Sequence, residues 1–147
     1  YMRRQHNLLI GERSAERIKI EVGAALTELE QTPADFEVRG RDLMTGIPKV
    51  IKVTSAEIAI ALDKSVAKIE EAVLKALEIS PPELSADIYE NGIHLTGGGA
   101  LLRGLDKRLA VKTKLPIHIA EDPLRAVVRG TGAAIKNIPA FRSVLLT

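Results

Sequence analysis

The sequence has no cysteine, no tryptophan, and only two tyrosines and two phenylalanines among its 147 residues. The absence of cysteine excludes a disulfide framework and a thiolate zinc site. So few aromatic rings leave little surface on which nucleic-acid bases could stack. The net charge is only +2, from 21 basic and 19 acidic residues that alternate along the chain. We therefore expect no nucleic-acid partner.

Long apolar runs and clustered metal ligands are also lacking. No stretch approaches the roughly 20 apolar residues that cross a bilayer, and residues 1–4 lack the apolar centre of a signal peptide. His6, His94 and His118 are scattered, with no carboxylate cluster beside them, so no metal site is predicted. With 46% hydrophobic residues, the composition is that of one globular domain, or of a domain with a smaller module inserted.

The most informative stretch is Ile93–Leu105, in which a short apolar run stops at three consecutive glycines, 97–99. Glycine adopts positive φ and lets another group approach the backbone, so the pattern predicts a strand followed by a bare loop. A helix over about Leu101–Lys112 would point its free amides toward this loop, which suits ribose and phosphate oxygens. A tight turn without any ligand is the ordinary alternative.

Apolar periodicity and turn residues predict the other elements. In chain order they are the end of a helix at 1–10, a helix at 12–22, two strands around 36–39 and 50–53 joined by a hairpin, the longest helix at 56–78, a short helix at 81–90, a strand at 93–96, a helix at 101–112, a strand at 116–119 and a last helix from 122 to 136. Ser55, Ser80 and Asp122 are the expected N-caps. The order strand, helix, strand, helix implies a parallel pair with a crossover. Gly130 and Gly132, inside the last helix, should permit close packing.

Glu16 and Lys19 are three residues apart on the helix expected at 12–22, which makes them neighbours on one helix face. An exposed ion pair, worth only a few tenths of a kcal/mol, is the ordinary explanation of such a pair.

Three stretches together resemble one family. They are residues 11–19 (GERSAERIK), 95–105 (LTGGGALLRGL) and 122–132 (DPLRAVVRGTG). Their order and spacing resemble the second half of the MreB-type proteins, the bacterial actin homologues. The hairpin text at 38–48 (VRGRDLMTGIP) favours this family over the Hsp70 chaperones, which share only the nucleotide motifs.

The resemblance implies an α/β fold, namely the second lobe of an actin-like ATPase of the ribonuclease H-like type, partial here and with a small α+β subdomain inserted. Residues 1–23 and 81–147 would form subdomain IIA, and residues 24–80 would form subdomain IIB. Few contacts should cross between the inserted subdomain and the remainder, because its strands and long helix can bury each other's apolar faces.

The resemblance also implies a nucleotide site, in which ATP or ADP lies in a cleft between two lobes. The glycines would approach the ribose and phosphates, while Glu16 and Lys19 would hydrogen-bond the ribose hydroxyls. The implied nucleotide-binding residues are Glu16, Lys19, Gly97, Gly98, Gly99 and Ala100. The family's Asp-Gly-Gly-Gly-Thr phosphate loops and its catalytic glutamate are not in this sequence. No catalytic residue is therefore predicted, and Mg²⁺ is expected only in the intact parent protein.

The implied function is that of a rod-shape-determining protein that forms filaments with copies of itself. The parent would be cytoplasmic, at the inner face of the cell membrane, where it organises wall synthesis with RodZ as a membrane partner. Membrane contact would come only through segments outside this sequence. The parent is expected to be a slow ATPase coupled to polymerisation, and this chain alone is expected to be inactive.

Two other functions remain open at this point. An Hsp70-type chaperone or a sugar kinase would use the same fold on another substrate, and upstream sequence would distinguish them by a peptide-binding domain or a sugar-facing carboxylate. A free-standing binding module, whose glycines form only a turn, is the third possibility.

Overall fold

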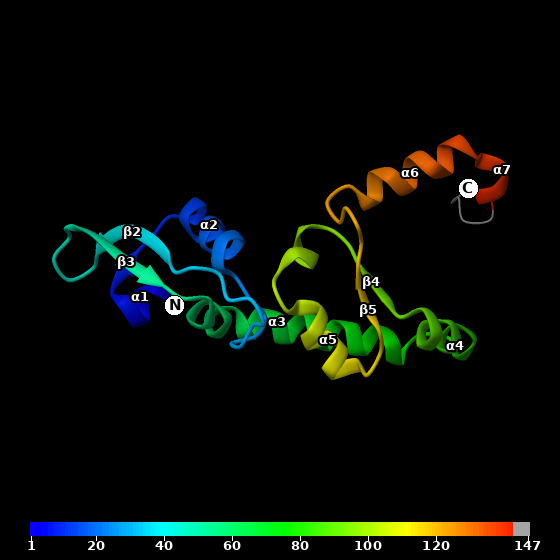
Figure 1. The fold of residues 1–147 in the computed structure, drawn as a ribbon, viewed down its shortest axis with the longest axis horizontal. Helices are drawn as coiled ribbons and strands as arrows, with labels where there is room; N and C mark the ends of the chain where they lie inside the picture. Colours follow the sequence, from blue (N-terminus) through cyan, green and yellow to red (C-terminus); the bar gives the residue numbers. More distant parts are fainter. Residues whose placement is uncertain (143–147) are drawn as a thin grey trace.

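The computed structural model of the protein describes residues 1–142 of the 147 (Figure 1). The last five residues of the range assigned to subdomain IIA, 143–147, lie outside the described residues. The elements in chain order are α1 (Met2–His6), β1 (Leu8–Leu9), α2 (Glu12–Val22), β2 (Phe36–Asp42), β3 (Pro48–Val53), α3 (Ser55–Glu78), α4 (Pro82–Asn91), β4 (Ile93–Leu95), the 3-10 turn η1 (Gly98–Leu101), α5 (Leu105–Thr113), β5 (Ile117–Ile119), α6 (Ala126–Lys136) and α7 (Ile138–Phe141).

The strands form two separate small sheets. The first has the antiparallel order β1-β2-β3, with the β2–β3 hairpin in register from the pair Phe36 and Val53 to the pair Arg41 and Pro48. The second is the parallel pair β4–β5, and α5 lies on the connection between its two strands. The predicted hairpin and the predicted parallel pair with a crossover are therefore confirmed.

The prediction of one helix over residues 1–10 is wrong beyond His6. Asn7 has a left-handed backbone, with φ of 51°, and ends α1. Leu8 then pairs with Asp42 of β2 and is completely buried. The error arose because a run of only three apolar residues fits a short strand as well as a helix turn.

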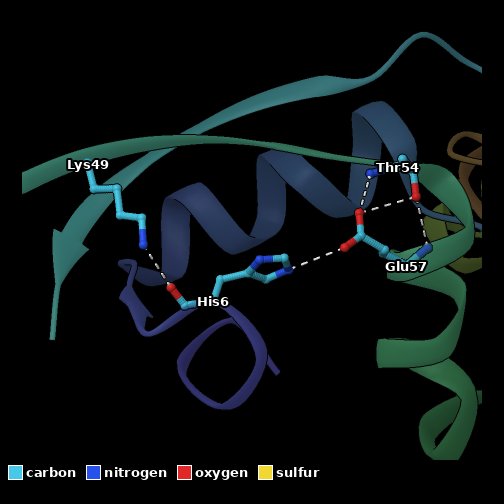
Figure 2. A network of polar contacts seen from close by, with 4 residues as sticks. All are labelled: His6, Lys49, Thr54 and Glu57. Carbon is cyan, nitrogen blue, oxygen red and sulfur yellow. Dashed lines mark hydrogen bonds and ion pairs between the residues drawn. The ribbon is translucent and has the colours of Figure 1, made fainter. Parts of the chain in front are cut away.

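The N-cap of α3 is Thr54 rather than the predicted Ser55, as Figure 2 shows. The amide of Glu57 donates to Thr54 Oγ1 at 3.2 Å, and the amide of Thr54 donates to Glu57 Oε2 at 2.9 Å. This reciprocal pair is a capping box, and the sequence Thr-Ser-Ala-Glu contains its signature. The other oxygen of Glu57 lies 3.3 Å from His6 Nε2, while Lys49 Nζ donates to the carbonyl of His6 (Figure 2). The capping box thus ties the start of α3 to α1.

Two other predicted caps are also wrong. The hydroxyl of Ser80 donates to the carbonyl of Ala76 at 2.8 Å, so it closes the end of α3 and leaves Pro81 to precede α4. Asp122 stands in a turn in which its carbonyl accepts from the amide of Arg125 at 3.1 Å, and α6 starts only after that turn. In both places, the residue that the pattern assigned to the start of the next helix makes a hydrogen bond in the segment before that helix.

The long helix α3 runs past both sheets (Figure 1). It contributes to two apolar clusters, one beside each sheet. Its first half packs Ile58 into a cluster that includes residues from outside the inserted segment. That cluster contains Met2, Leu8, Ile18, Val22, Val38, Val53 and Ile58. Its second half packs Val66 and Val73 against α5, in a cluster with Ala25, Leu105 and Leu109. The prediction that few contacts cross between residues 24–80 and the remainder is therefore wrong, while the residue bounds of subdomains IIA and IIB stay a prediction.

A polar contact joins α3 to α5 beside the second cluster. Arg108 Nε lies 2.6 Å from Glu70 Oε1, and its Nη1 lies 2.9 Å from both Asp63 Oδ1 and the carbonyl of Ala25. The hydrogen bond to Glu70 raises the pKa of the Arg108 guanidinium above its ordinary value, although burial acts in the opposite direction. Both side chains are largely buried, at 19% and 11% exposure, so this contact fixes α5 on α3 in a setting where water screens it little.

The hairpin between β2 and β3 is closed by Asp42. Its Oδ1 accepts from the amide of Met44 at 2.7 Å and from the amide of Thr45 at 3.1 Å, and these hydrogen bonds lower the pKa of the carboxyl group. Gly46, with φ of 74°, supplies the left-handed residue that the turn requires.

Helices α6 and α7 extend away from the sheets in Figure 1. No residue of α6 is buried, and Val127 and Val128 are more than 70% exposed. A Cβ added at Gly130 or Gly132 would meet nothing within 4 Å. The expected close packing at these two glycines is therefore not present in the described residues. None of the described helices is both long and apolar enough to span a membrane.

We predict that this chain by itself self-associates. Within residues 1–142, β4 pairs with β5 alone, so the opposite edge of β4 leaves its backbone groups free for another strand. The exposed apolar residues of α6 should add to this tendency. Light scattering should show oligomers whose mass rises with protein concentration. A monodisperse monomer at high concentration would contradict the prediction.

Candidate functional site

The glycine loop follows β4 and passes directly into η1. Gly97 has φ of 78° and ψ of 176°, a backbone conformation that only glycine adopts readily. Its amide donates to the carbonyl of Pro123 at 2.7 Å, which attaches the loop to the segment before α6. Gly98 and Gly99 are exposed, and a Cβ at Gly99 would meet nothing within 4 Å. The predicted bare loop after a strand is therefore present.

The loop offers two backbone amides to a ligand. Within the described residues, the amides of Gly98 and Gly99 make no hydrogen bond, as expected for the first residues of a helical turn. Ala100 differs, because its amide donates to the carbonyl of Gly97 at 3.2 Å and its side chain is 97% buried. The helix expected from Leu101 begins only at Leu105, so the free amides belong to η1 and not to α5.

Glu16 and Lys19 lie on α2 and contact each other. Lys19 Nζ is 2.8 Å from Glu16 Oε2, and the side chains are 49% and 57% exposed. Within residues 1–142 no hydrogen bond or ion pair joins either side chain to residues 97–100. The exposed ion pair that the spacing predicted is therefore present, and a ligand would have to fit between the two groups of residues.

An apolar cavity of about 300 Å³ lies on the side of α2 that carries Lys19. Its walls come from α1, β1, α2 and α3, and they include Tyr1, Ile18, Ile58 and Leu62. Lys19 therefore has an apolar cavity on one side and solvent on the other. An aliphatic stem beside an apolar wall and an ammonium group in water is a common arrangement for lysine.

The link between α2 and the glycine loop is Arg103, which the motif contains but to which sequence reasoning gave no role. Its Nη1 donates to the carbonyls of Ile20 and Gly23 at 3.2 and 3.5 Å. The amide of Ala25 donates to the carbonyl of Arg103 at 2.8 Å. The two side-chain bonds join positions 83 and 80 residues apart, so no local pattern could have indicated them.

The three histidines do not gather in one place within residues 1–142. His94 and His118 are opposite each other in the β4–β5 register, with ring centroids 5.0 Å apart, and His6 lies beside Glu57. Within the described residues, no group of three or more His, Asp or Glu side chains is placed to hold a metal ion.

Comparison with known proteins identifies the family. The family model described as MreB/Mbl protein matches residues 1–143. The chain belongs to the MreB/Mbl family. The Bacillus cereus cell shape-determining protein Mbl is 49% identical over 138 residues, which cover 94% of this chain and 41% of that protein. The Escherichia coli K12 cell shape-determining protein MreB is also 49% identical over 138 residues, covering 94% and 39%. This MreB/Mbl chain thus spans about two fifths of the length of its relatives.

Solved structures confirm the actin-like α/β fold of this MreB/Mbl chain. MreB5 of Spiroplasma citri bound to ADP has a TM-score of 0.88 and 38% identity, and the match covers 94% of this chain and 41% of that one. The same protein bound to AMPPNP also has a TM-score of 0.88, with 37% identity and coverage of 99% and 43%. A double helical filament of MamK, with a TM-score of 0.65, 23% identity and coverage of 84% and 37%, shares the fold alone.

Proposed function

We propose that this chain is the nucleotide-binding lobe of a cell shape-determining, filament-forming protein that binds ATP or ADP. The observation that carries the proposal is the pair of free amides at Gly98 and Gly99, in a loop without side chains. Free backbone amides at the start of a helical turn bind phosphate or ribose oxygens. Support also comes from Spiroplasma citri MreB5, whose structures contain ADP and AMPPNP.

The residues present fit a nucleotide in their chemistry. The carboxylate of Glu16 accepts hydrogen bonds and the ammonium of Lys19 donates them, which suits the two hydroxyls of a ribose. The ion pair between them is exposed, so exchanging it for contacts with a ligand costs little. The glycines would let the phosphates approach the main chain. The bound nucleotide would supply the phosphoanhydride bond, and the residues named here would hold and orient it.

The wider role that we propose for the parent protein rests on the family. It is assembly with copies of itself into filaments at the cytoplasmic face of the membrane, where a RodZ-type partner and the wall-synthesis machinery would act with it. Mg²⁺ would bind through the nucleotide phosphates and groups outside this chain. The family match over residues 1–143 favours this function over a chaperone, a sugar kinase or an unrelated binding module.

We predict that Glu16→Ala combined with Lys19→Ala in the full-length protein weakens ATP binding about tenfold to a hundredfold. The physical reason is the loss of hydrogen bonds between charged side chains and the ribose. The fold should be unchanged, because both residues are exposed. Isothermal titration with ATP measures the effect, and circular dichroism checks the fold.

A matched control is Lys68→Ala combined with Glu71→Ala, which removes the same two charges from exposed positions three residues apart on α3. The control should bind ATP like the wild type. If the Glu16 and Lys19 variant also binds ATP with unchanged affinity, the two residues form only a surface ion pair.

A further inference from the structure

We propose that Arg103 is a positioning residue of the nucleotide site, which holds the glycine loop in place against the C-terminal end of α2. The inference rests on the proposed nucleotide-binding function, because it assigns a role within that same site. Arg103 itself would not touch the nucleotide. It would set the distance between the two groups of residues that do.

The contacts of Arg103 come from both its side chain and its main chain. Its guanidinium Nη1 donates to the carbonyls of Ile20 and Gly23, at 3.2 and 3.5 Å. The carbonyl of Arg103 accepts from the amide of Ala25 at 2.8 Å. Arg103 and Ala24 also form an isolated parallel β-bridge. The end of α2 and the end of η1 are therefore joined at several points and not by one flexible side chain.

We call the contacts of Arg103 with residues 20–25 the joint. The electrostatics of this joint favour arginine. The last carbonyls of a helix have no partner inside the helix and carry the negative end of its dipole. A guanidinium group has several donors in a fixed plane and keeps its charge, so it can serve two carbonyls together. A neutral side chain at position 103 would lose the charge interaction and leave at least one of these carbonyls without its donor.

The backbone beyond Arg103 turns at Gly104, close to the loop of residues 26–31. Gly104 has φ of 76°, and a Cβ there would come within 3.1 Å of the Leu26 side chain. The loop of residues 26–31 thus packs closely against this turn, where it also lines a cavity of about 600 Å³ with Arg103 and Lys107. The turn is held on one side by Arg103 and on the other by Leu26.

The joint is close in sequence to both halves of the site. Ile20 follows Lys19 directly and comes four residues, or about one helical turn, after Glu16. Arg103 comes four residues after Gly99 and directly follows Leu102, the C-cap of η1. A shift at the joint would therefore change the distance between the ribose-binding side chains and the loop amides. Misplacement of that kind weakens the binding of a ligand that needs both.

The test is ATP titration of the full-length protein with Arg103→Gln, which keeps a polar side chain but removes the charge. We expect about tenfold weaker binding, which corresponds to about 1.4 kcal/mol. Arg103→Lys, which restores a cation at the helix end, should recover affinity to within about threefold of the wild type. Arg41→Gln, at an exposed position of β2 distant from the joint in sequence, is the control and should bind like the wild type.

A double-mutant cycle separates positioning from general stability. The losses of ATP affinity caused by Arg103→Gln and by Glu16→Gln should not add in the double variant. Once Arg103→Gln has displaced the loop, the nucleotide already interacts less well with Glu16, so Glu16→Gln weakens binding less. Additive losses, or unchanged binding by Arg103→Gln, would overturn this inference while leaving nucleotide binding in place. If the wild-type protein itself fails to bind ATP, the proposed function is wrong whatever Arg103 does. If Arg103→Gln does not fold, Arg103→Met, which keeps an unbranched side chain but has no donor, takes its place in the cycle, and coupling with Glu16→Gln is again expected.

Discussion

The 147-residue chain by itself should bind ATP at least a thousandfold more weakly than the full-length protein. The chain offers two loop amides and the side chains of Glu16 and Lys19, but the family's Asp-Gly-Gly-Gly-Thr phosphate loops are not in its sequence. Each charge-assisted hydrogen bond is worth about 1.5–3 kcal/mol, so the loss of three would weaken binding by roughly three to six powers of ten.

This expectation can be separated from simple misfolding by comparing ATP with adenosine. If the missing interactions are those of the phosphates, the isolated chain should bind the two ligands about equally weakly, whereas the full-length protein should bind ATP far more tightly than adenosine. Fluorescent nucleotide analogues suit the measurement because the chain has no tryptophan to contribute background. Low-micromolar binding of ATP by the isolated chain would show that the phosphates are held by residues 1–147.

Helices could be predicted from the sequence wherever the periodic spacing of apolar residues extended over several turns. The helix at Glu12–Val22 has the bounds that its apolar spacing and the glycines at either end predicted, and α3 differs from its prediction by one residue. Short segments were harder to predict. The apolar residues of β1, for example, fit a helix as well as a strand until their partner β2 is known. Tertiary pairing decides such cases, and it is not visible in a local pattern.

Helix starts were less predictable because several polar residues compete for each cap. Thr54 and Ser55 are neighbours, and only the position of Glu57 three residues after Thr54 distinguishes them. Ser80 had the expected sequence context but bonds backward to Ala76. A serine hydroxyl can donate to a carbonyl at the end of the preceding helix or accept from an amide at the start of the following helix. The two hydrogen bonds are similar in energy, so the composition of the turn does not determine which one forms.

The bare glycine loop and the Glu16–Lys19 ion pair were each predictable from the sequence, but their arrangement in space was not. The family resemblance indicated the glycine loop and the Glu16–Lys19 pair separately, and within residues 1–142 no hydrogen bond or ion pair joins them. What connects them, Arg103, acts on carbonyls of Ile20 and Gly23, and main-chain acceptors leave no signature in a sequence. One partner of Arg108 is likewise a main-chain carbonyl, that of Ala25, while its other partners, Glu70 and Asp63, lie far from it in sequence on α3.

Arg108→Ala should strongly destabilise the contact between α3 and α5. It would remove hydrogen bonds to Glu70, to Asp63 and to the carbonyl of Ala25, and it would leave the carboxylate of Glu70, only 11% exposed, without a cation. Breaking a buried pair from one side costs about 3 kcal/mol, because an unpaired charge stays in a poorly solvated place. In the full-length protein, amide hydrogens of α5 and of the second half of α3 should then exchange about a hundredfold faster.

Two control variants show whether the faster amide exchange comes from the unpaired carboxylate of Glu70. Lys107→Ala removes the adjacent cation, whose ion pair with Glu30 is exposed on both sides, so its effect on exchange should be small. Arg108→Met combined with Glu70→Leu removes both charges and fills the space with apolar atoms, so it should recover much of the protection that Arg108→Ala loses. If Arg108→Ala exchanges no faster than Lys107→Ala, packing of Val66, Leu105 and Leu109 holds α5 on α3 without the polar contact.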